Sequence, residues 1–305
     1  MKTDSNLERV LEAGHFAVTA ELGPPRSADA EAIRRKARLL KGNVDAFNVT
    51  DGQTAVVRMA SWAGNLIGIE EGLDGIVQMT CRDRNRLALQ MDILGVAALG
   101  INNILCLTGD HIVFGDHPYA KGVFDIDSVQ FIQIVRQMRD DRKVYSGNEL
   151  EVPPCLFIGA AANPFADPFE FRVPRLAKKI TAGADFIQTQ IVYNVDKFAE
   201  WMKRVRDRGL DQQTKILAGV APIRSAGAAR YMKTKVPGMD VPDEIVERLR
   251  GVPREQVAPE GIKLCVDIIN RVQEIQGVAG IHLMAIEWED AVPEIVDRSG
   301  LLPRP

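Results

Sequence analysis

The segment Val18-Thr19-Ala20-Glu21-Leu22-Gly23-Pro24-Pro25 is a short apolar run that ends on a carboxylate and is then broken by a glycine and two prolines. The apolar run predicts a buried strand over residues 16–21. Gly23 permits an unusual backbone angle and the prolines cannot join a sheet, so the strand must stop at Glu21 or Leu22. A strand that ends beside a forced turn delivers Glu21 to the rim of a sheet.

The composition is ordinary for a soluble globular protein. The chain has 305 residues, of which 46% are hydrophobic and 26% charged, and its net charge is -3 with acids and bases mixed along it. This balance indicates neither a nucleic-acid partner nor a membrane partner. No apolar run reaches the roughly 18 residues that span a bilayer. The polar N-terminus is unlike a signal peptide, so we expect a cytoplasmic protein.

Cysteine and histidine spacing predicts no metal site. Four cysteines lie far apart and mostly inside apolar runs, as reduced core residues do: Cys81, Cys106, Cys155 and Cys265. The sequence has no CxxC pair, which argues against an internal iron–sulfur cluster or thiolate zinc site. The histidines lack HxH and HExxH spacing. We expect His111 and His117 to be solvated loop residues and His282 to be a satisfied core or barrel residue.

Strand and helix patterns alternate along the whole chain. Short apolar runs predict seven further strands, at residues 45–50, 75–80, 103–107, 155–161, 186–191, 215–220 and 280–286. Helices are predicted between them, at residues 27–41, 56–64, 85–99, 128–138, 168–183, 195–208, 225–234, 242–250 and 260–276, with a short helix at 5–14 and a last one from about 290. Ser27 and Asp167 are the expected caps of two helices. Leu87, Met91, Leu94 and Ala98 recur at helical spacing.

Eight strands alternating with helices predict an α/β protein, a (β/α)8 TIM barrel that forms a single domain over residues 1–305 with a short N-terminal helix. Barrels of this kind commonly run to about 250 residues as one domain. An open doubly wound sheet is the alternative. It fits less well because no GxGxxG loop follows the first strand and because the alternation covers the whole chain.

In a (β/α)8 barrel the active site is built at the carboxyl ends of the strands. The residues that close the strands should therefore gather in one place: Glu21, Thr50, Asp51, Thr80, Thr108, Gly109, Asp110, Asn163, Gln190 and the backbone near Gly219 and Ala221. This set contains few titratable groups and no histidine. Such a site suits a cofactor with its own chemistry and a substrate that needs one proton.

Four of the polar side chains have a candidate role and an alternative. Glu21 is the candidate proton donor, or else it pairs with a core arginine. Asp110 follows Gly109, which lets the backbone approach a ligand, although Thr-Gly-Asp is also an ordinary turn sequence. Gln190 can donate and accept hydrogen bonds as the amide edge of a heterocycle requires, or it supports a neighbouring loop. Lys179 meets a phosphate or is solvated.

At these residues the chain resembles methylenetetrahydrofolate reductase, over about residues 15 to 300. The matching segments occur in the family's order: 19–25, 48–50, 79–81, 100–110, 183–190 and 219–223. Cys81-Arg82-Asp83-Arg84-Asn85 is similar to the branch that includes the fused homocysteine methyltransferase–reductase proteins and the acetogen reductases. The resemblance thus implies one-carbon metabolism, serving methionine biosynthesis or acetogenesis.

The resemblance implies a flavin, FAD or FMN, and the reduction of 5,10-methylenetetrahydrofolate to 5-methyltetrahydrofolate by hydride from flavin N5. Glu21 would match the acid that protonates N10, and Asp110 the aspartate near the flavin N1 edge and the folate. Gln190 would match the glutamine that contacts folate and nicotinamide. Electrons would come from NADH or NADPH, or from an iron–sulfur or flavin partner subunit, and we expect a homo- or hetero-oligomer.

The resemblance also implies the positions that contact flavin: Thr50, Gln78, Thr108, Gly109, Asp110, Phe124, Asp125, Ala161, Asn163, Asp167 and Lys179. Met232 would contact the substrate, together with Glu21, Asp110 and Gln190.

Several positions depart from the family pattern. Gln78 stands in place of a histidine, Asn163 of a tyrosine, Arg172 of an aspartate, Met232 of a phenylalanine, Ala228 of a glutamine and Trp288 of an arginine. These departures leave the flavin and its electron donor open. Two alternative functions also stay open. One is a non-catalytic barrel subunit that binds folate or docks a redox partner, and the other is a flavin-free pterin-binding methyltransferase.

Overall fold

Eight parallel strands close into a barrel, each paired with the next in sequence and the last paired with the first. The structure is a computed structural model that describes residues 1–236 and 238–305. The strands are β1 Ala17–Leu22, β2 Ala46–Val49, β3 Gly75–Thr80, β4 Asn103–Leu107, β5 Phe157–Ala162, β6 Phe186–Ile191, β7 Lys215–Val220 and β8 Val278–Leu283. The predicted (β/α)8 barrel is confirmed.

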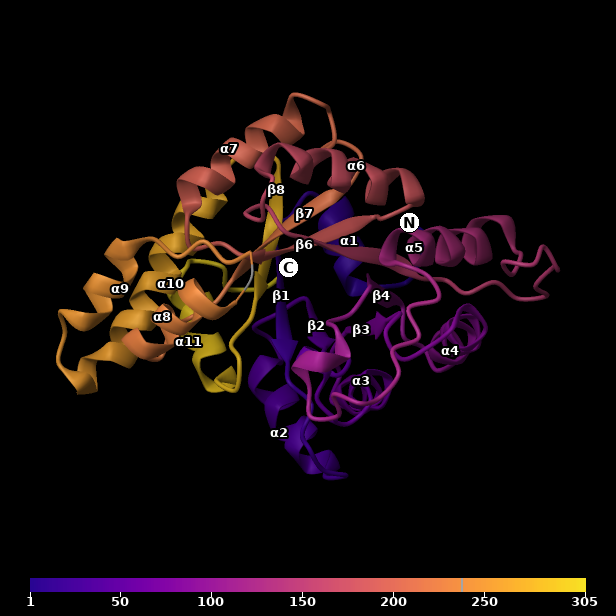
Figure 1. Ribbon diagram of the computed structural model, residues 1–305, viewed down its shortest axis with the longest axis horizontal. Helices are drawn as coiled ribbons and strands as arrows, with labels where there is room; N and C mark the ends of the chain where they lie inside the picture. Colours follow the sequence, from indigo (N-terminus) through magenta and orange to yellow (C-terminus); the bar gives the residue numbers. More distant parts are fainter. Residues whose placement is uncertain (237) are drawn as a thin grey trace.

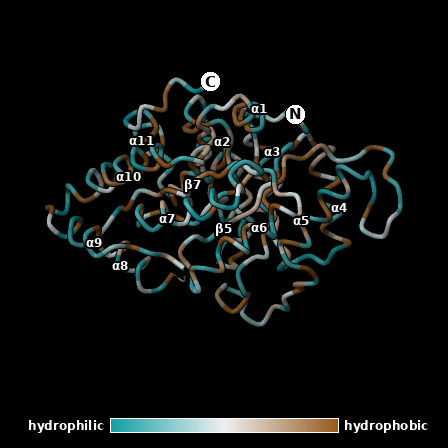
Figure 2. The backbone as a smooth tube through the Cα atoms, turned by 90° about the horizontal axis from the view of Figure 1, so that it is seen from above, coloured by the Kyte–Doolittle hydropathy of each residue, from teal (hydrophilic) through white to brown (hydrophobic). Residues whose placement is uncertain are grey.

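Helices surround the barrel (Figure 1). They are α1 Asn6–Glu12, α2 Ala30–Leu40, α3 Ser61–Glu70, α4 Arg86–Ala98, α5 Ser128–Arg136, α6 Arg172–Ala182, α7 Val195–Arg206, α8 Ala226–Lys235, α9 Asp243–Arg250, α10 Val257–Gln273 and α11 Val292–Arg298. Figures 1 and 2 agree that α8 to α11 lie together on one side of the molecule and α4 and α5 on the other. In Figure 2 hydrophobic and hydrophilic residues alternate along these helices, as expected where one face packs on strands and the other meets solvent.

The barrel interior is closed at the amino ends of its strands. Leu7, Val10 and Leu11 of α1 are buried against inward side chains of the strands, Phe157 and Phe186 among them. These two rings stack with centroids 5.1 Å apart. A second apolar cluster fills the space between the strands and the surrounding helices. With the floor of the barrel packed, space for a ligand remains at the carboxyl ends of the strands.

Three predicted helix starts are wrong, each for a local reason. Asp29, not Ser27, caps α2, since its side chain accepts a hydrogen bond from the Glu31 amide at 3.0 Å. The helix predicted over 56–64 lies at Ser61–Glu70, because left-handed backbone angles at residues 52, 54 and 55 hold the preceding segment in a loop. Asp167 does not cap α6, which begins at Arg172 after a short 3-10 turn.

The helix predicted over 85–99 is present as α4, but the apolar residues whose spacing predicted it do not form its buried face. Leu87 and Met91 are 65% and 64% exposed, whereas the buried residues of this helix are Leu89, Ile93 and Val96. Apolar residues occupy both faces of α4. Helical spacing alone therefore could not distinguish the face that packs on the barrel from the face that meets solvent.

Candidate active site

Two adjoining cavities open at the carboxyl ends of the strands. The first has a volume of about 420 Å³ and reaches down to His282 and Gln188 inside the barrel. The second has a volume of about 300 Å³ and extends toward the loops after β2, β3 and β4. Several residues line both cavities: Glu21, Gln78, Leu107, Asp110, Ala161, Arg175 and Lys179. The two cavities thus form one site with the Glu21 carboxylate between them.

Glu21 lies near the end of β1, where the Gly-Pro-Pro turn stops the strand. Its Oε2 lies 3.5 Å from Nε2 of Gln78 and 3.9 Å from Nε2 of His282. No arginine within the described part of the chain lies within ion-pair distance of Glu21. The carboxylate therefore keeps its second oxygen and its lone pairs available to a ligand.

His282 is a site residue that strand-end reasoning misses. It lies on β8 beside Thr19 of β1, is 3% exposed, and lines the first cavity under Glu21. A sequence signal does exist. The apolar Leu283, the last residue of β8, separates His282 from Met284, and alternation continued past the strand end places His282 and Met284 on the same, inward side. The expectation of a buried barrel histidine is confirmed, but its position next to Glu21 was not foreseen.

A β-bulge directs Gln190 into the first cavity. The register between β6 and β7 shifts between Gln188 and Ile191, and Thr189 Oγ1 accepts a hydrogen bond from the Gly219 amide at 2.9 Å. A Cβ on Gly219 would lie 2.3 Å from the Thr189 carbonyl oxygen, so the close approach of the strands needs glycine there. Gln190 Oε1 accepts from the Ile191 amide at 3.0 Å, which leaves its NH2 group for a ligand.

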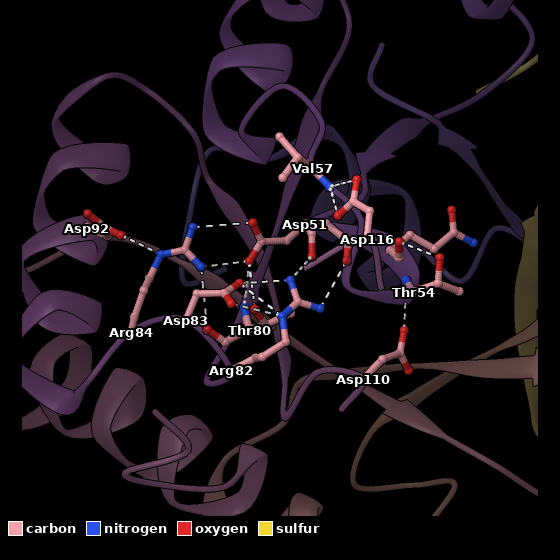
Figure 3. Close-up of polar contacts among 12 residues, drawn as sticks. Asp51, Thr54, Val57, Thr80, Arg82, Asp83, Arg84, Asp92, Asp110 and Asp116 are labelled. Carbon is pink, nitrogen blue, oxygen red and sulfur yellow. Dashed lines mark hydrogen bonds and ion pairs between the residues drawn. The ribbon is translucent and has the colours of Figure 1, made fainter. Parts of the chain in front are cut away.

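Asp110 lines both cavities and is tied to the loop after β2 (Figure 3). Its Oδ2 accepts a hydrogen bond from the Thr54 amide at 2.9 Å. The preceding Gly109 has a φ of +94°, and a Cβ there would lie 3.0 Å from Cβ of Thr80. The glycine therefore brings the backbone close to β3 while Asp110 closes the loop over the second cavity.

Asp51 is not available for chemistry, because a buried ionic network engages it (Figure 3). Its Oδ2 accepts from the Thr80 amide at 2.9 Å, from Thr80 Oγ1 at 3.0 Å and from Nη1 of Arg84 at 2.7 Å. Arg82 is 4% exposed and donates to the Gly52 carbonyl at 3.0 Å. Arg82 and Arg84 thus hold the loop after β2 against the end of β3, and this loop forms one wall of the second cavity.

The second cavity has groups that fit a flavin. The buried Thr50 Oγ1 has no hydrogen-bond partner among the described residues, so it offers a hydroxyl to a ligand. Lys179 donates to the Ala161 carbonyl at 2.6 Å, and burial, aided by Arg175, lowers the pKa of its ammonium to about 8. A polar heterocycle with an anionic tail would satisfy the Thr50 hydroxyl and compensate the buried Lys179 charge.

Four residues predicted to bind cofactor or substrate lie outside the lining of both cavities: Phe124, Asp125, Asp167 and Met232. Phe124 stacks on His111 instead. Asp125 pairs with Arg86 at 2.7 Å, and that guanidinium lowers the pKa of the carboxyl to about 2. Asp167 is exposed, and the Met232 sulfur accepts a hydrogen bond from the Tyr193 hydroxyl.

The remaining predicted residues are brought together. Thr50, Thr108 and Gly109 line the second cavity, Asn163 and Gln190 line the first, and five line both: Glu21, Gln78, Asp110, Ala161 and Lys179. Within residues 1–236 and 238–305, no group of three histidine, cysteine, aspartate or glutamate side chains is placed to hold a metal ion. None of the described helices is long and apolar enough to cross a membrane.

The fold and this site define a (β/α)8 barrel with a polar small-molecule site at the carboxyl ends of its strands. Within that class, the chain belongs to the methylenetetrahydrofolate reductase family, whose model matches residues 6–300. The "Methylenetetrahydrofolate reductase 2" of Schizosaccharomyces pombe is 28% identical over 272 residues, which are 84% of this chain and 40% of that protein. The "5,10-methylenetetrahydrofolate reductase" of Pectobacterium carotovorum is 22% identical over 296 residues, which cover 95% of this chain and 92% of that protein.

The length of the relatives differs between groups. The chain spans 37% to 51% of the length of the fungal, nematode and plant relatives. Among solved structures, a protein of Clostridium thermocellum is described as binding two copies of 5-methyl-5,6,7,8-tetrahydrofolic acid. It superposes with a TM-score of 0.66 at 14% identity and covers 98% of this chain and 100% of its own. At this identity the likeness supports the fold alone.

Proposed function

We propose that this protein catalyses the flavin-dependent reduction of 5,10-methylenetetrahydrofolate to 5-methyltetrahydrofolate. The observation that carries the proposal is the position of Glu21 between two connected cavities, in a chain of this family. One cavity would receive the cofactor and the other the substrate, so that the acid lies at the junction where a bound substrate can be protonated.

The second cavity would hold the flavin. Thr50 would donate or accept through its unpartnered hydroxyl, Gly109 would let the backbone approach the ring, and Lys179 would meet an anionic group. A reduced flavin bound there would supply the hydride that the methylene carbon accepts. FAD and FMN share the ring system and a phosphate, and both fit this reasoning.

The first cavity would hold the folate. Glu21 would give its proton to N10 of the substrate, which opens the five-membered ring to an iminium at N5 and leaves Glu21 as a carboxylate. Gln190 would hydrogen-bond the pterin through its amide, and Asp110 would accept hydrogen bonds from the ligand through Oδ1, which the Thr54 amide leaves free. Gln78 would stay beside Glu21 as a hydrogen-bond donor to the carboxylate.

Electrons would come from NADH or NADPH, or from an iron–sulfur or flavin subunit as in the branch that the 81–85 segment resembles. Arg172 and Arg175 line the first cavity with Lys179 and give it a positive rim. Such a rim suits a phosphate-bearing donor as well as the carboxylate tail of folate. The cytoplasmic location and the oligomeric assembly remain predictions from the sequence.

The experiment that tests this function compares wild type with Glu21→Gln and with Glu149→Gln, a control in an exposed hairpin. The visible spectrum and the mass of the released cofactor identify the flavin in all three. Glu21→Gln should still take electrons into the flavin but form methyltetrahydrofolate about 10²–10⁴-fold more slowly, the range for general acid catalysis. Normal turnover in that variant would refute the mechanism.

The same preparation separates the alternatives. Absence of a flavin band after incubation with FAD and with FMN would favour a flavin-free pterin-binding methyltransferase or a non-catalytic subunit. A protein that binds folate but turns over neither alone nor with a redox partner would favour the non-catalytic subunit.

A further inference from the structure

Beneath Glu21 lies a group of four buried polar side chains inside the barrel, here named the inner polar layer: Thr19 of β1, Asn48 of β2, Gln188 of β6 and His282 of β8. Their exposed fractions are 0%, 0%, 2% and 3%. Barrel interiors are dominated by branched apolar residues, and a buried polar group destabilises the fold unless it is hydrogen-bonded. A polar layer at this depth therefore needs an explanation.

The hydrogen bonds of the inner polar layer begin with a reciprocal amide pair. Asn48 Nδ2 donates to Gln188 Oε1 at 2.8 Å, and Gln188 Nε2 donates to Asn48 Oδ1 at 3.0 Å. The second hydrogen of Gln188 Nε2 points to Thr19 Oγ1, at 3.2 Å, and to Nδ1 of His282, at 3.3 Å. Thr19 Oγ1 in turn lies 3.0 Å from Nδ1 of His282 and 3.3 Å from the Ile281 carbonyl.

With the two amides oriented in this way, the hydrogen bonds favour one nitrogen of His282 as the carrier of hydrogen. Gln188 Nε2 can only donate, and a Thr19 hydroxyl that accepts from it has its own hydrogen to give. Of the two acceptors near that hydroxyl, Nδ1 is the closer. Nδ1 therefore accepts hydrogen bonds, and in the neutral ring the hydrogen lies on Nε2. That nitrogen is the one directed at Glu21, with Oε2 at 3.9 Å.

We propose that His282 is a positioning residue for Glu21, held by the inner polar layer as the Nε2–H tautomer so that it donates to the carboxylate that remains after protonation of the substrate. This role rests on the proposed function of Glu21 as the acid. No bond of His282 is made or broken, and the proton delivered to N10 is that of Glu21 alone. The 3.9 Å separation shortens when the carboxylate becomes charged, because the N–H dipole is attracted to a charged oxygen more than to a protonated one.

Other charged groups do not take this position. Among the described residues, Glu21 is the titratable side chain within ion-pair distance of the His282 ring. Asp110, Arg172, Arg175 and Lys179 line the same cavity without an ion pair to it. The stabilisation that His282 supplies is therefore specific to the charged state of Glu21, and it grows during the proton transfer rather than before it.

The tautomer is tested by NMR on protein labelled with 15N-histidine, which contains only four histidines. The ring nitrogen shifts of His282 should report a neutral Nε2–H tautomer. Signals are assigned by their loss in His282→Asn and, if that variant does not fold, by elimination with His15→Asn, His111→Asn and His117→Asn. A neutral Nδ1–H tautomer would overturn the proposal, whatever the protein's activity.

The functional role is tested by two substitutions that keep different nitrogens. His282→Gln places an amide NH2 near Nε2, and His282→Asn keeps a polar group near Nδ1 only. Turnover should fall about tenfold in His282→Asn, which is less than the 10²–10⁴-fold loss expected when a general acid itself is removed. Turnover should largely recover in His282→Gln. KM should stay within about twofold, since the effect belongs to the proton transfer. His15→Asn, exposed before β1, is the control.

A double variant separates positioning from a structural effect. Because His282 acts through Glu21, Glu21→Gln with His282→Asn should be no slower than Glu21→Gln alone. The proposal would be overturned if the double variant lost turnover by the product of the two single-variant losses. Full turnover in His282→Asn would also overturn it. If wild type does not reduce methylenetetrahydrofolate at all, the proposed function fails, and the tautomer measurement alone decides whether the inner polar layer orients His282.

Discussion

Replacing Lys179 by Met should leave the protein at least as stable as wild type at pH 7 but less stable than wild type at pH 10. Lys179 is 8% exposed, and burial, aided by Arg175, lowers its pKa from 10.5 to about 8. Its one hydrogen-bond acceptor is the Ala161 carbonyl at 2.6 Å. Met has a similar length and no charge, so the substitution removes the titration and keeps most of the packing.

The sign follows from proton counting. Between about pH 8 and pH 10.5 the unfolded chain holds a proton on Lys179 that the folded protein has released, so the free energy of unfolding of wild type rises with pH through this window. Below pH 8 both states are protonated and that stabilisation is lost. At about 1.4 kcal/mol per pH unit the full change is about 3 kcal/mol.

The loss of the hydrogen bond opposes this gain. Leaving the partly buried Ala161 carbonyl without this donor costs up to about 1–3 kcal/mol at any pH. Lys179→Met should therefore be as stable as wild type or up to about 2 kcal/mol more stable at pH 7. At pH 10, where the wild-type amine is neutral, only the hydrogen-bond loss remains and the variant should be less stable.

Urea unfolding at pH 7, 8, 9 and 10 measures both proteins, and the difference between them cancels other groups that titrate in this range. Lys178→Met is the matched control, because Lys178 is the exposed neighbour on the same helix and its substitution should give no pH-dependent difference. A Lys179→Met difference that is constant from pH 7 to pH 10 would refute the reasoning. Flavin affinity should also fall in Lys179→Met, which equilibrium titration with FMN and FAD would detect.

Two further substitutions test the loops over the second cavity. Asp51→Asn removes the charge that pairs with Arg84 at 2.7 Å and leaves Arg84 with the more exposed Asp92 at 2.9 Å as its one carboxylate partner among the described residues, so we expect about 1.5–3 kcal/mol lower stability in urea unfolding. Retained stability would contradict a structural role for this pair. Asp110→Ala removes the acceptor of the Thr54 amide, so limited proteolysis should cut near residue 54 at least severalfold faster, and an unchanged rate would contradict that link.

The strands could be predicted because parallel strands buried on both faces are short apolar runs. Six predicted strands match to within one residue at each end, but the strands predicted at 155–161 and 280–286 begin two residues away, since the observed strands are Phe157–Ala162 and Val278–Leu283. The apolar composition continues beyond the hydrogen-bonded segment in both places, so sequence alone does not mark where pairing begins. Helix starts were less predictable, because backbone angles near Thr54 depend on contacts with distant loops.

The sequence allowed us to predict which residues at strand ends line the cavities, but it did not allow the same for residues in the long loops. Glu21, Thr50, Asp110 and Gln190 meet because strand topology fixes their positions. Phe124 and Asp125 lie in a long loop, and the Asp125–Arg86 pair that holds them away links segments 39 residues apart. No local pattern encodes such a pair.

The same logic explains why Glu21 was found and His282 was not. A polar residue before a turn can be recognised from its neighbours in sequence, whereas His282 becomes significant only through the pairing of β8 with β1, which sets it beside Thr19. Closure of the barrel creates that pairing, and no shorter segment contains it. The position of Glu21 is therefore encoded locally, while the placement of His282 beside it depends on the whole fold. Under the proposed mechanism, substitutions far from both residues that weaken barrel closure should lower turnover before they abolish ligand binding.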